Sequence, residues 1–146
     1  MTDESRAATV TIRRVLPATA PEVFEFWTRP ELLMQWMSPY AGEVQSEVEA
    51  DPRVGGRFRL CMHGPEKECE ITGEYVEVDP PRRLAFTWSG PPTNNHMTLV
   101  TVELRPLRDT TELTLTHERL PTSQIREGHV AGWANVFDHL SAVIHR

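Results

Sequence analysis

His117 is the side chain that the sequence places best for acid–base chemistry. It follows Leu113 and Leu115 at every second position of a segment with strand composition, and alternate residues of a strand face the same side. If the two leucines face the interior, so does His117, where its imidazole could donate a hydrogen bond or act as a general acid or base. The structural alternative, which we favour, is a strand-end histidine that bonds with water or a backbone carbonyl. His117 is therefore a candidate catalytic residue without a supporting motif.

The histidine spacings in the sequence do not predict a metal site. His63, His96 and His117 could approach one end of a sheet, but the sequence contains no H-x-H or H-E-x-x-H spacing that would set ligands side by side. The G-x-G-x-x-G, P-loop and G-x-S-x-G patterns are also absent from the sequence, so it offers no nucleotide-binding loop and no nucleophile elbow. We therefore expect no metal and no cofactor.

The two cysteines leave two interpretations open. Cys61 and Cys69 lie eight residues apart around an expected turn, so they could sit nearly opposite each other in a hairpin and form a disulfide. Two reduced thiols are the interpretation we favour, because disulfides are rare inside the cell. No C-x-x-C spacing supports a zinc site.

Composition narrows the class of protein. The chain has 146 residues, 39% of them hydrophobic and 25% charged, and a net charge of −6. This composition excludes disorder and fits one domain over residues 1–146, with 1–7 as a flexible N-terminal tail. No basic stripe favours nucleic acid, and no apolar run approaches the ~20 residues of a membrane span. The start of the chain lacks the apolar core of a signal peptide, so we predict a cytoplasmic location.

The order of expected elements predicts the fold class. A strand at 8–16 precedes two short helices, each introduced by a possible capping box, the first at Thr19–Glu22 and the second at Thr28–Glu31. Alternating residues then predict six antiparallel strands between short turns, at 43–49, 57–63, 69–78, 84–88, 96–105 and 111–117. A helix of about 20 residues ends the chain. The prediction is an α+β fold in which a bent antiparallel sheet wraps around the long C-terminal helix.

The C-terminal helix combines an apolar stripe with two glycines. The stripe consists of large residues at spacings of three and four, namely Val130, Trp133, Phe137, Leu140 and Ile144. Gly128 and Gly132 lie one turn apart, and each costs about 1 kcal/mol relative to alanine inside a helix. Two explanations remain open, a close approach of the helix to the sheet or space left for a ligand.

Several sequence segments match one known pattern in order. They are 20–36 (APEVFEFWTRPELLMQW), 51–58 (DPRVGGRF), 73–75 (GEY), 80–84 (PPRRL) and Gly132-Trp133. The first resembles the opening signature of the START-like (SRPBCC) superfamily, in the branch named for homology to the activator of the heat-shock protein 90 ATPase. The second resembles the D-x-R-x-G-G-x-[FY] strand entry of that branch. The resemblance covers residues 8–144 and departs at Met37, where an aromatic residue is frequent.

The resemblance implies a helix-grip fold with an apolar cavity between the sheet and the long helix. Counting residues outward from each predicted hairpin turn gives one row of neighbouring residues across the sheet, with Trp88 beside Gly73 and Met97. The row consists of Phe58, Gly73, Trp88, Met97 or Thr98, and His117. The expected ligand-binding residues are large side chains that could surround that cavity: Trp36, Phe58, Leu60, Trp88, His117 and Trp133.

Three functions follow as hypotheses. The first is a binding protein for a small apolar or amphipathic ligand, and the second is a cyclase- or hydrolase-like enzyme that uses His117 with a glutamate and requires His117 to titrate near neutral pH. The third is a protein that interacts with a chaperone or acts in a stress response. Fold membership does not choose among them.

Overall fold

The computed structural model describes residues 8–40, 46–64 and 68–144, so the predicted flexible tail at 1–7 lies outside it. In chain order the elements are β1 (Val10–Leu16), α2 (Ala20–Thr28), α3 (Pro30–Leu33), β2 (Ser46–Ala50), β3 (Arg57–His63), β4 (Glu68–Asp79), β5 (Arg83–Trp88), the 3₁₀ turn η1 (Pro91–Thr93), β6 (Thr98–Pro106), β7 (Thr111–Glu118) and α4 (Ser123–Ile144).

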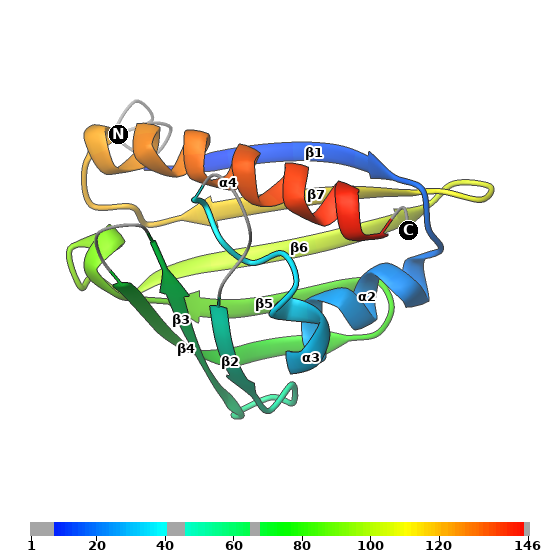
Figure 1. Cartoon of the computed structure of the whole chain (residues 1–146), viewed down its shortest axis with the longest axis horizontal. Helices are drawn as coiled ribbons and strands as arrows, with labels where there is room; N and C mark the ends of the chain where they lie inside the picture. Colours follow the sequence, from blue (N-terminus) through cyan, green and yellow to red (C-terminus); the bar gives the residue numbers. More distant parts are fainter. Residues whose placement is uncertain (1–7, 41–45, 65–67, 145–146) are drawn as a thin grey trace.

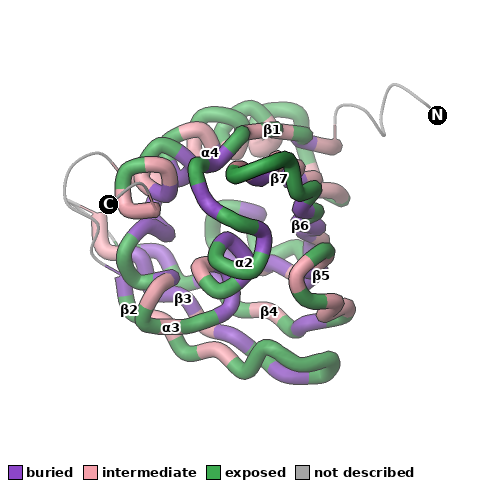
Figure 2. Tube along the Cα trace, turned by 90° about the vertical axis from the view of Figure 1, so that its right-hand side faces the viewer, coloured by how far each residue is buried: buried purple, intermediate pink, exposed green. Residues whose placement is uncertain are grey.

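The described strands form one antiparallel sheet of seven strands in the order β1-β7-β6-β5-β4-β3-β2. The first strand therefore pairs with the last, and α2 and α3 carry the chain to the opposite edge at β2 (Figure 1). The strands curve round α2 and α4 when seen from the side (Figure 2). The predicted α+β helix-grip fold is confirmed, including its two short helices after the first strand.

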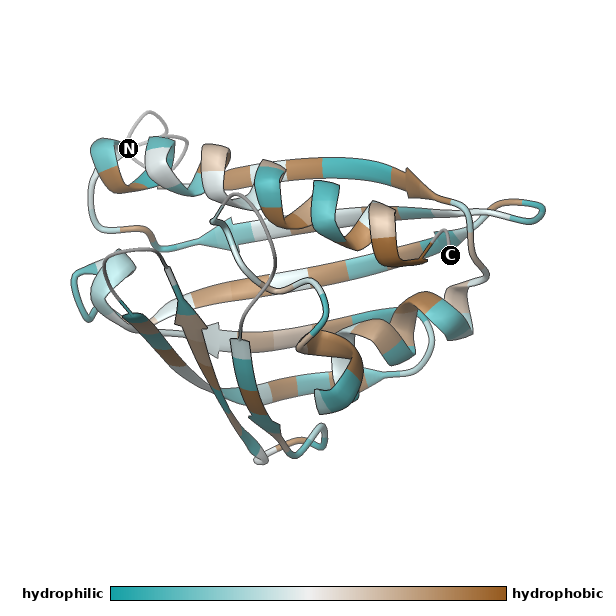
Figure 3. Cartoon of the chain, viewed as in Figure 1, coloured by the Kyte–Doolittle hydropathy of each residue, from teal (hydrophilic) through white to brown (hydrophobic). Residues whose placement is uncertain are grey.

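Alternation of apolar and polar residues determines which face of the sheet is buried. Along β7 every second residue is buried, and the buried set is Thr111, Leu113, Leu115 and His117. Hydrophobic and hydrophilic bands likewise alternate along the strands and α4 (Figure 3). His117 faces the interior with the two leucines, as the two-residue period predicts.

Register on the inner face agrees with the predicted row at Phe58 and Gly73 and decides between its two alternatives beside Trp88. Phe58 pairs with Gly73, and Trp88 pairs with Thr98, one of the two residues predicted in the row. The other, Met97, is 67% exposed. The cause is the β5–β6 connection, where η1 and the left-handed residues Asn94 and Asn95 replace the symmetrical turn assumed from the sequence.

The helix starts also differ from the predicted capping boxes. Neither α2 nor α3 has a side-chain cap hydrogen bond. The Thr19 hydroxyl donates to the Glu22 carboxylate at 3.2 Å instead of accepting from a backbone amide. Thr28 belongs to the last turn of α2, where its hydroxyl donates to the Phe24 carbonyl at 2.9 Å. The N-cap position of α3 is occupied by Arg29 instead of Thr28, so Thr28 does not cap this helix.

Aromatic side chains connect the helices to the sheet in one continuous core. The Trp27 ring packs edge-on against Trp36 with centroids 4.7 Å apart and lies 6.4 Å from Trp133. Trp133 in turn lies 5.2 Å from Trp88 on β5. The buried stripe of α4 begins at Trp133, because Val130 is 43% exposed, so the stripe is shorter than predicted.

The two cysteines lie on opposite faces of the sheet and form no disulfide with each other. Cys69 pairs with Met62 on the inner face, whereas Cys61 pairs with Glu70 on the outer face. Thiols on opposite faces cannot meet across two strands, so this fold excludes the disulfide. Burial, and secondarily the Glu68 carboxylate, raise the pKa of the Cys61 thiol.

Gly73 provides a test of this packing, because its position cannot hold a side chain. A Cβ there would lie 2.0 Å from the Thr87 carbonyl oxygen and 2.4 Å from the Phe58 ring. We predict that Gly73→Ala lowers the free energy of unfolding by about 1–3 kcal/mol, the usual cost of overpacking, in urea titrations. Glu74→Ala, at the exposed neighbouring position, should change it by less than about 0.5 kcal/mol. Equal effects of the two substitutions would contradict the packing.

Candidate functional site

An apolar cavity of about 250 Å³ lies against the N-terminal half of α4. The other walls come from the segment after α3, the adjoining ends of β3 and β4, and the β5–η1 region. Its lining includes Met37, Tyr40, Met62, Trp88, Gly132 and Trp133. Gly128 also lines the cavity and is exposed, so the cavity reaches the surface at this turn of α4.

The segment after α3 is held against α4 by two side chains. Asn135 Nδ2 donates to the Pro39 carbonyl at 3.1 Å, and His139 Nδ1 lies 2.9 Å from the Ser38 carbonyl. Trp36, at the start of this segment, donates from Nε1 to the Phe26 carbonyl at 3.1 Å. These bonds fix one wall of the cavity, although the segment contains no regular secondary structure beyond Trp36.

The six predicted ligand-binding residues separate into three groups. Trp88 and Trp133 line the 250 Å³ cavity. Phe58 and Leu60, again with Trp88, line a second cavity of about 20 Å³ deeper in the core. Trp36 and His117 are fully buried and belong to neither lining.

His117 takes part in a buried chain of hydrogen bonds. Trp133 Nε1 donates to His117 Nδ1 at 3.0 Å, and His117 Nε2 lies 2.7 Å from the Thr98 hydroxyl. The Thr98 hydroxyl donates to the Trp88 carbonyl at 2.6 Å. Since an indole N–H can only donate, Nδ1 must accept, and the imidazole proton therefore sits on Nε2 and points at Thr98.

Burial accounts for the protonation state of His117. Burial lowers the pKa of His117 to about 3, with a smaller contribution from His129, so the ring is neutral at neutral pH. Both ring nitrogens are engaged within the core. The enzyme hypothesis required a histidine that titrates near neutral pH, and the depressed pKa disagrees with that requirement.

His129 is a polar residue of the cavity wall that sequence reasoning missed. It lines the cavity, and its Nδ1 lies 2.8 Å from the Ile125 carbonyl. A carbonyl accepts only, so the proton sits on Nδ1 and leaves Nε2 as an acceptor. Among the described residues no hydrogen bond engages Nε2. Burial lowers the pKa of His129, which keeps this acceptor in its neutral form.

A sequence signal for this wall did exist. Ile125, His129, Gly132 and Val136 recur at spacings of four, three and four, and all line the cavity. This stripe lies beside the apolar stripe that contains Trp133, whose larger residues give the stronger periodic signal in the sequence. Met37 and Tyr40 gave no comparable signal, because irregular backbone has no periodicity.

Two residues that line the small cavity carry buried hydrogen-bond donors without a partner among the described residues. The indole nitrogens of Trp27 and Trp88 are the two buried side-chain polar atoms without a partner in the described part of the chain, and both residues line this cavity. A volume of about 20 Å³ holds one water molecule. Met37 and Trp88 line both cavities and separate one from the other.

The helix glycines favour the second of the two explanations left open by the sequence. A Cβ at Gly128 would meet nothing within 4 Å, and a Cβ at Gly132 would lie 3.6 Å from Pro39 Cβ, an ordinary contact. Close packing on the sheet therefore does not require either glycine. Their positions beside the cavity are consistent with space for a ligand.

The depressed pKa of His117 leads to a pH-dependent stability. The folded-state pKa lies below the unfolded value of about 6.5, so the unfolded chain binds more protons between these values and stability falls as the pH falls below about 6.5. We predict that the wild type loses up to about 1.4 kcal/mol more per pH unit than His117→Gln between pH 6 and 4, measured by urea unfolding. Parallel curves for the wild type and His117→Gln would refute this assignment.

The open space at Gly128 leads to a prediction of the opposite sign to that for Gly73. Gly128→Ala should raise the free energy of unfolding by about 1 kcal/mol, because alanine favours the helix and nothing obstructs its methyl group. Thermal and urea unfolding would measure the change. A loss of stability would mean that this turn of α4 packs more closely than described.

A bent antiparallel sheet around a long helix, with an apolar cavity between the two, defines the class as the helix-grip fold. The family model described as Activator of Hsp90 ATPase homolog 1-like protein matches residues 17–145. The chain belongs to this family, whose fold is that of the SRPBCC superfamily.

Solved structures show the same fold across bacteria. Protein CV1439 from Chromobacterium violaceum superposes with a TM-score of 0.83 at 23% identity, covering 95% of this chain and 98% of that one. A protein from Rhodobacter sphaeroides gives 0.80 at 26% identity, with coverage of 95% and 93%. CalU16 from Micromonospora echinospora gives 0.71 at 24% identity, with coverage of 93% and 75%. A search of the curated proteins finds no match.

Within the described residues, no helix has both the length and the apolar character needed to cross a membrane.

Proposed function

We propose that this protein binds a small, mainly apolar molecule in the cavity beside α4. The observation that carries the proposal is the pair of helix glycines at the cavity wall, where alanine would fit without a clash. Glycine weakens a helix by about 1 kcal/mol, and no packing constraint here requires it. Space for a ligand supplies the missing reason.

The volume of the cavity limits the size of the ligand. An engineered cavity of about 150 Å³ in another protein binds benzene. In proportion, a cavity of about 250 Å³ accepts a molecule on the order of ten non-hydrogen atoms. A fused bicyclic ring or a short branched chain has this size.

The polar groups of the wall suggest one hydrogen-bonding group on the ligand. The unprotonated Nε2 of His129 can accept a hydrogen bond, so it favours a ligand with a hydroxyl or N–H group. Tyr40 also lines the cavity, and burial raises the pKa of its phenol, which therefore stays protonated. The remaining lining is largely apolar. We infer an amphipathic ligand with a single donor, such as a phenol.

Binding is better supported than catalysis. Among the described residues the cavity lining contains no carboxylate, and His117 has both nitrogens engaged. The described residues therefore do not form the histidine–glutamate pair of the enzyme hypothesis. The interaction with a chaperone and the cytoplasmic location stay predictions from the sequence.

Titration with 2-naphthol and naphthalene tests the proposal. We predict that 2-naphthol binds with a dissociation constant on the order of 10 µM, as expected for about eleven well-buried atoms, measured by calorimetry and by the shift in melting temperature. Naphthalene, which lacks the hydroxyl, should bind about tenfold more weakly. His129→Leu should remove this preference.

Two variants of α4 locate the binding site. Gly132→Leu places a side chain in the cavity and should abolish binding, whereas Ala131→Leu adds the same group at the exposed neighbouring position and should leave it unchanged. Absence of binding by the wild type, or equal binding by the Gly132→Leu variant, would overturn the proposal.

A further inference from the structure

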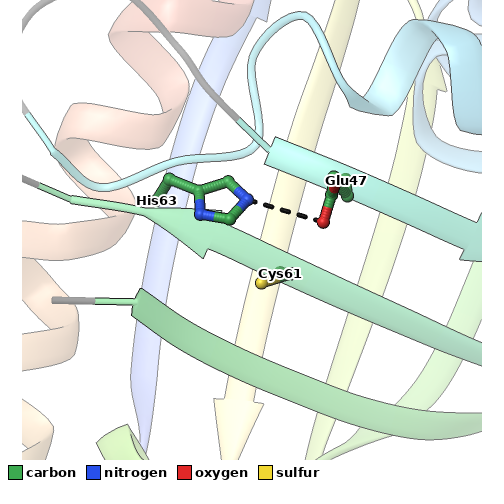
Figure 4. A group of neighbouring side chains, drawn as sticks. All are labelled: Glu47, Cys61 and His63. Atoms are coloured by element: carbon green, nitrogen blue, oxygen red, sulfur yellow. Dashed lines mark ion pairs between the residues drawn. The ribbon is translucent and has the colours of Figure 1, made fainter.

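A second group of chemically active side chains lies on the other face of the sheet. Glu47 on β2 pairs directly with Cys61 on β3, and His63 follows Cys61 by two residues on the same face. One potential ligand atom from each side chain lies within 4.8 Å of the other two. Figure 4 shows the three side chains together at this corner of the sheet. The intervening residue Met62 faces the apolar cavity instead.

The orientation of His63 is fixed by carboxylates on both sides. Its Nε2 lies 3.5 Å from Glu47 Oε2, and its Nδ1 lies 3.2 Å from Glu68 Oε1 on β4. Histidines that bind metals through one nitrogen commonly donate the other N–H to a carboxylate, which holds the ring in place. Glu68 occupies that supporting position, and Nε2 is directed toward the first glutamate.

This corner departs from the pattern on the rest of the outer face. Elsewhere cross-strand arginine–glutamate pairs occupy the face, as between Arg59 and Glu70 at 2.9 Å and between Arg83 and Glu103 at 3.0 Å. Two and four residues beyond Arg59, the strand carries the thiol of Cys61 and the imidazole of His63 instead of guanidinium groups. No arginine or lysine forms an ion pair with Glu47 or Glu68 among the described residues.

We propose that Glu47, Cys61 and His63 bind a zinc ion, with water in the fourth position. Thiolate sulfur, imidazole nitrogen and carboxylate oxygen are the ligand types of zinc, whereas calcium and magnesium take oxygen ligands. Tetrahedral zinc needs ligand atoms about 3.3–3.7 Å apart, closer than the 4.8 Å limit seen here. The Glu47 side chain is 68% exposed, so it can rotate inward without disturbing the core.

The sequence predicted no metal because the ligands have no linear motif. Cys61 and His63 stand two apart on a strand, and the third ligand comes from a different strand. Only the β2–β3 register brings the three together. The competing explanation is that His63 forms ion pairs with the two glutamates and binds no cation.

Metal titration of the full chain distinguishes these explanations. After treatment with a chelator, the protein should bind one Zn²⁺ per chain in calorimetry. Co²⁺ in its place should produce the thiolate-to-cobalt absorption band that reports a cysteine ligand. Cys61→Ser and His63→Ala should weaken binding by more than about 100-fold, since supporting residues alone contribute 10–100-fold. Glu68→Gln should weaken it by about tenfold.

The second cysteine is the matched control. Cys69→Ser alters a thiol on the inner face and should leave the cobalt band unchanged. If Cys61→Ser fails to fold, as judged by circular dichroism, Glu47→Gln tests the same site at an exposed position and should weaken binding by at least tenfold. Absence of the cobalt band in the wild type, or a band that survives Cys61→Ser, would overturn the proposal in favour of ion pairs alone.

Discussion

The buried hydrogen-bond chain from Trp133 through His117 and Thr98 to the Trp88 carbonyl is the constraint on which the interior depends. It joins α4 to β7, β6 and β5. Each member is buried, and an unsatisfied polar group in the core costs about 1–3 kcal/mol. These hydrogen bonds therefore fix the distance between α4 and the sheet at Trp133. The turns of α4 that precede this anchor carry the glycines, and there the space between helix and sheet stays open.

The two faces of the sheet have different chemistry, and the strand period of two keeps them apart. On the inner face the polar atoms either bond to one another, as at His117, or border a cavity, as at His129 and Trp88. The outer face carries the cross-strand ion pairs, and single exposed ion pairs contribute little to stability. Substitution on one face leaves the other face largely undisturbed.

Sequence reasoning succeeded where a period or an ordered motif carried the information. The alternation along β7 placed His117 inside, and the order of motifs gave the helix-grip fold. It failed where position depends on partners distant in the chain. The choice between Met97 and Thr98 depended on a 3₁₀ turn, Tyr40 comes from irregular backbone, and Trp36 is a core residue because it packs on Trp27. Size and hydrophobicity alone did not separate cavity walls from solid core.

The pairing of β1 with β7 has a consequence for how the chain becomes a folded protein. Val10 sits opposite His117, so more than a hundred residues separate partners in adjacent strands. On a ribosome, the first strand emerges long before the strand that completes its hydrogen bonds, and Arg14 must wait longer still for Asp138 on the final helix. The sheet edge formed by β6 also stays uncovered until β7 arrives. Folding of this architecture therefore finishes only after β7 and α4 have been synthesised, and the nascent chain spends that interval with unpaired strands.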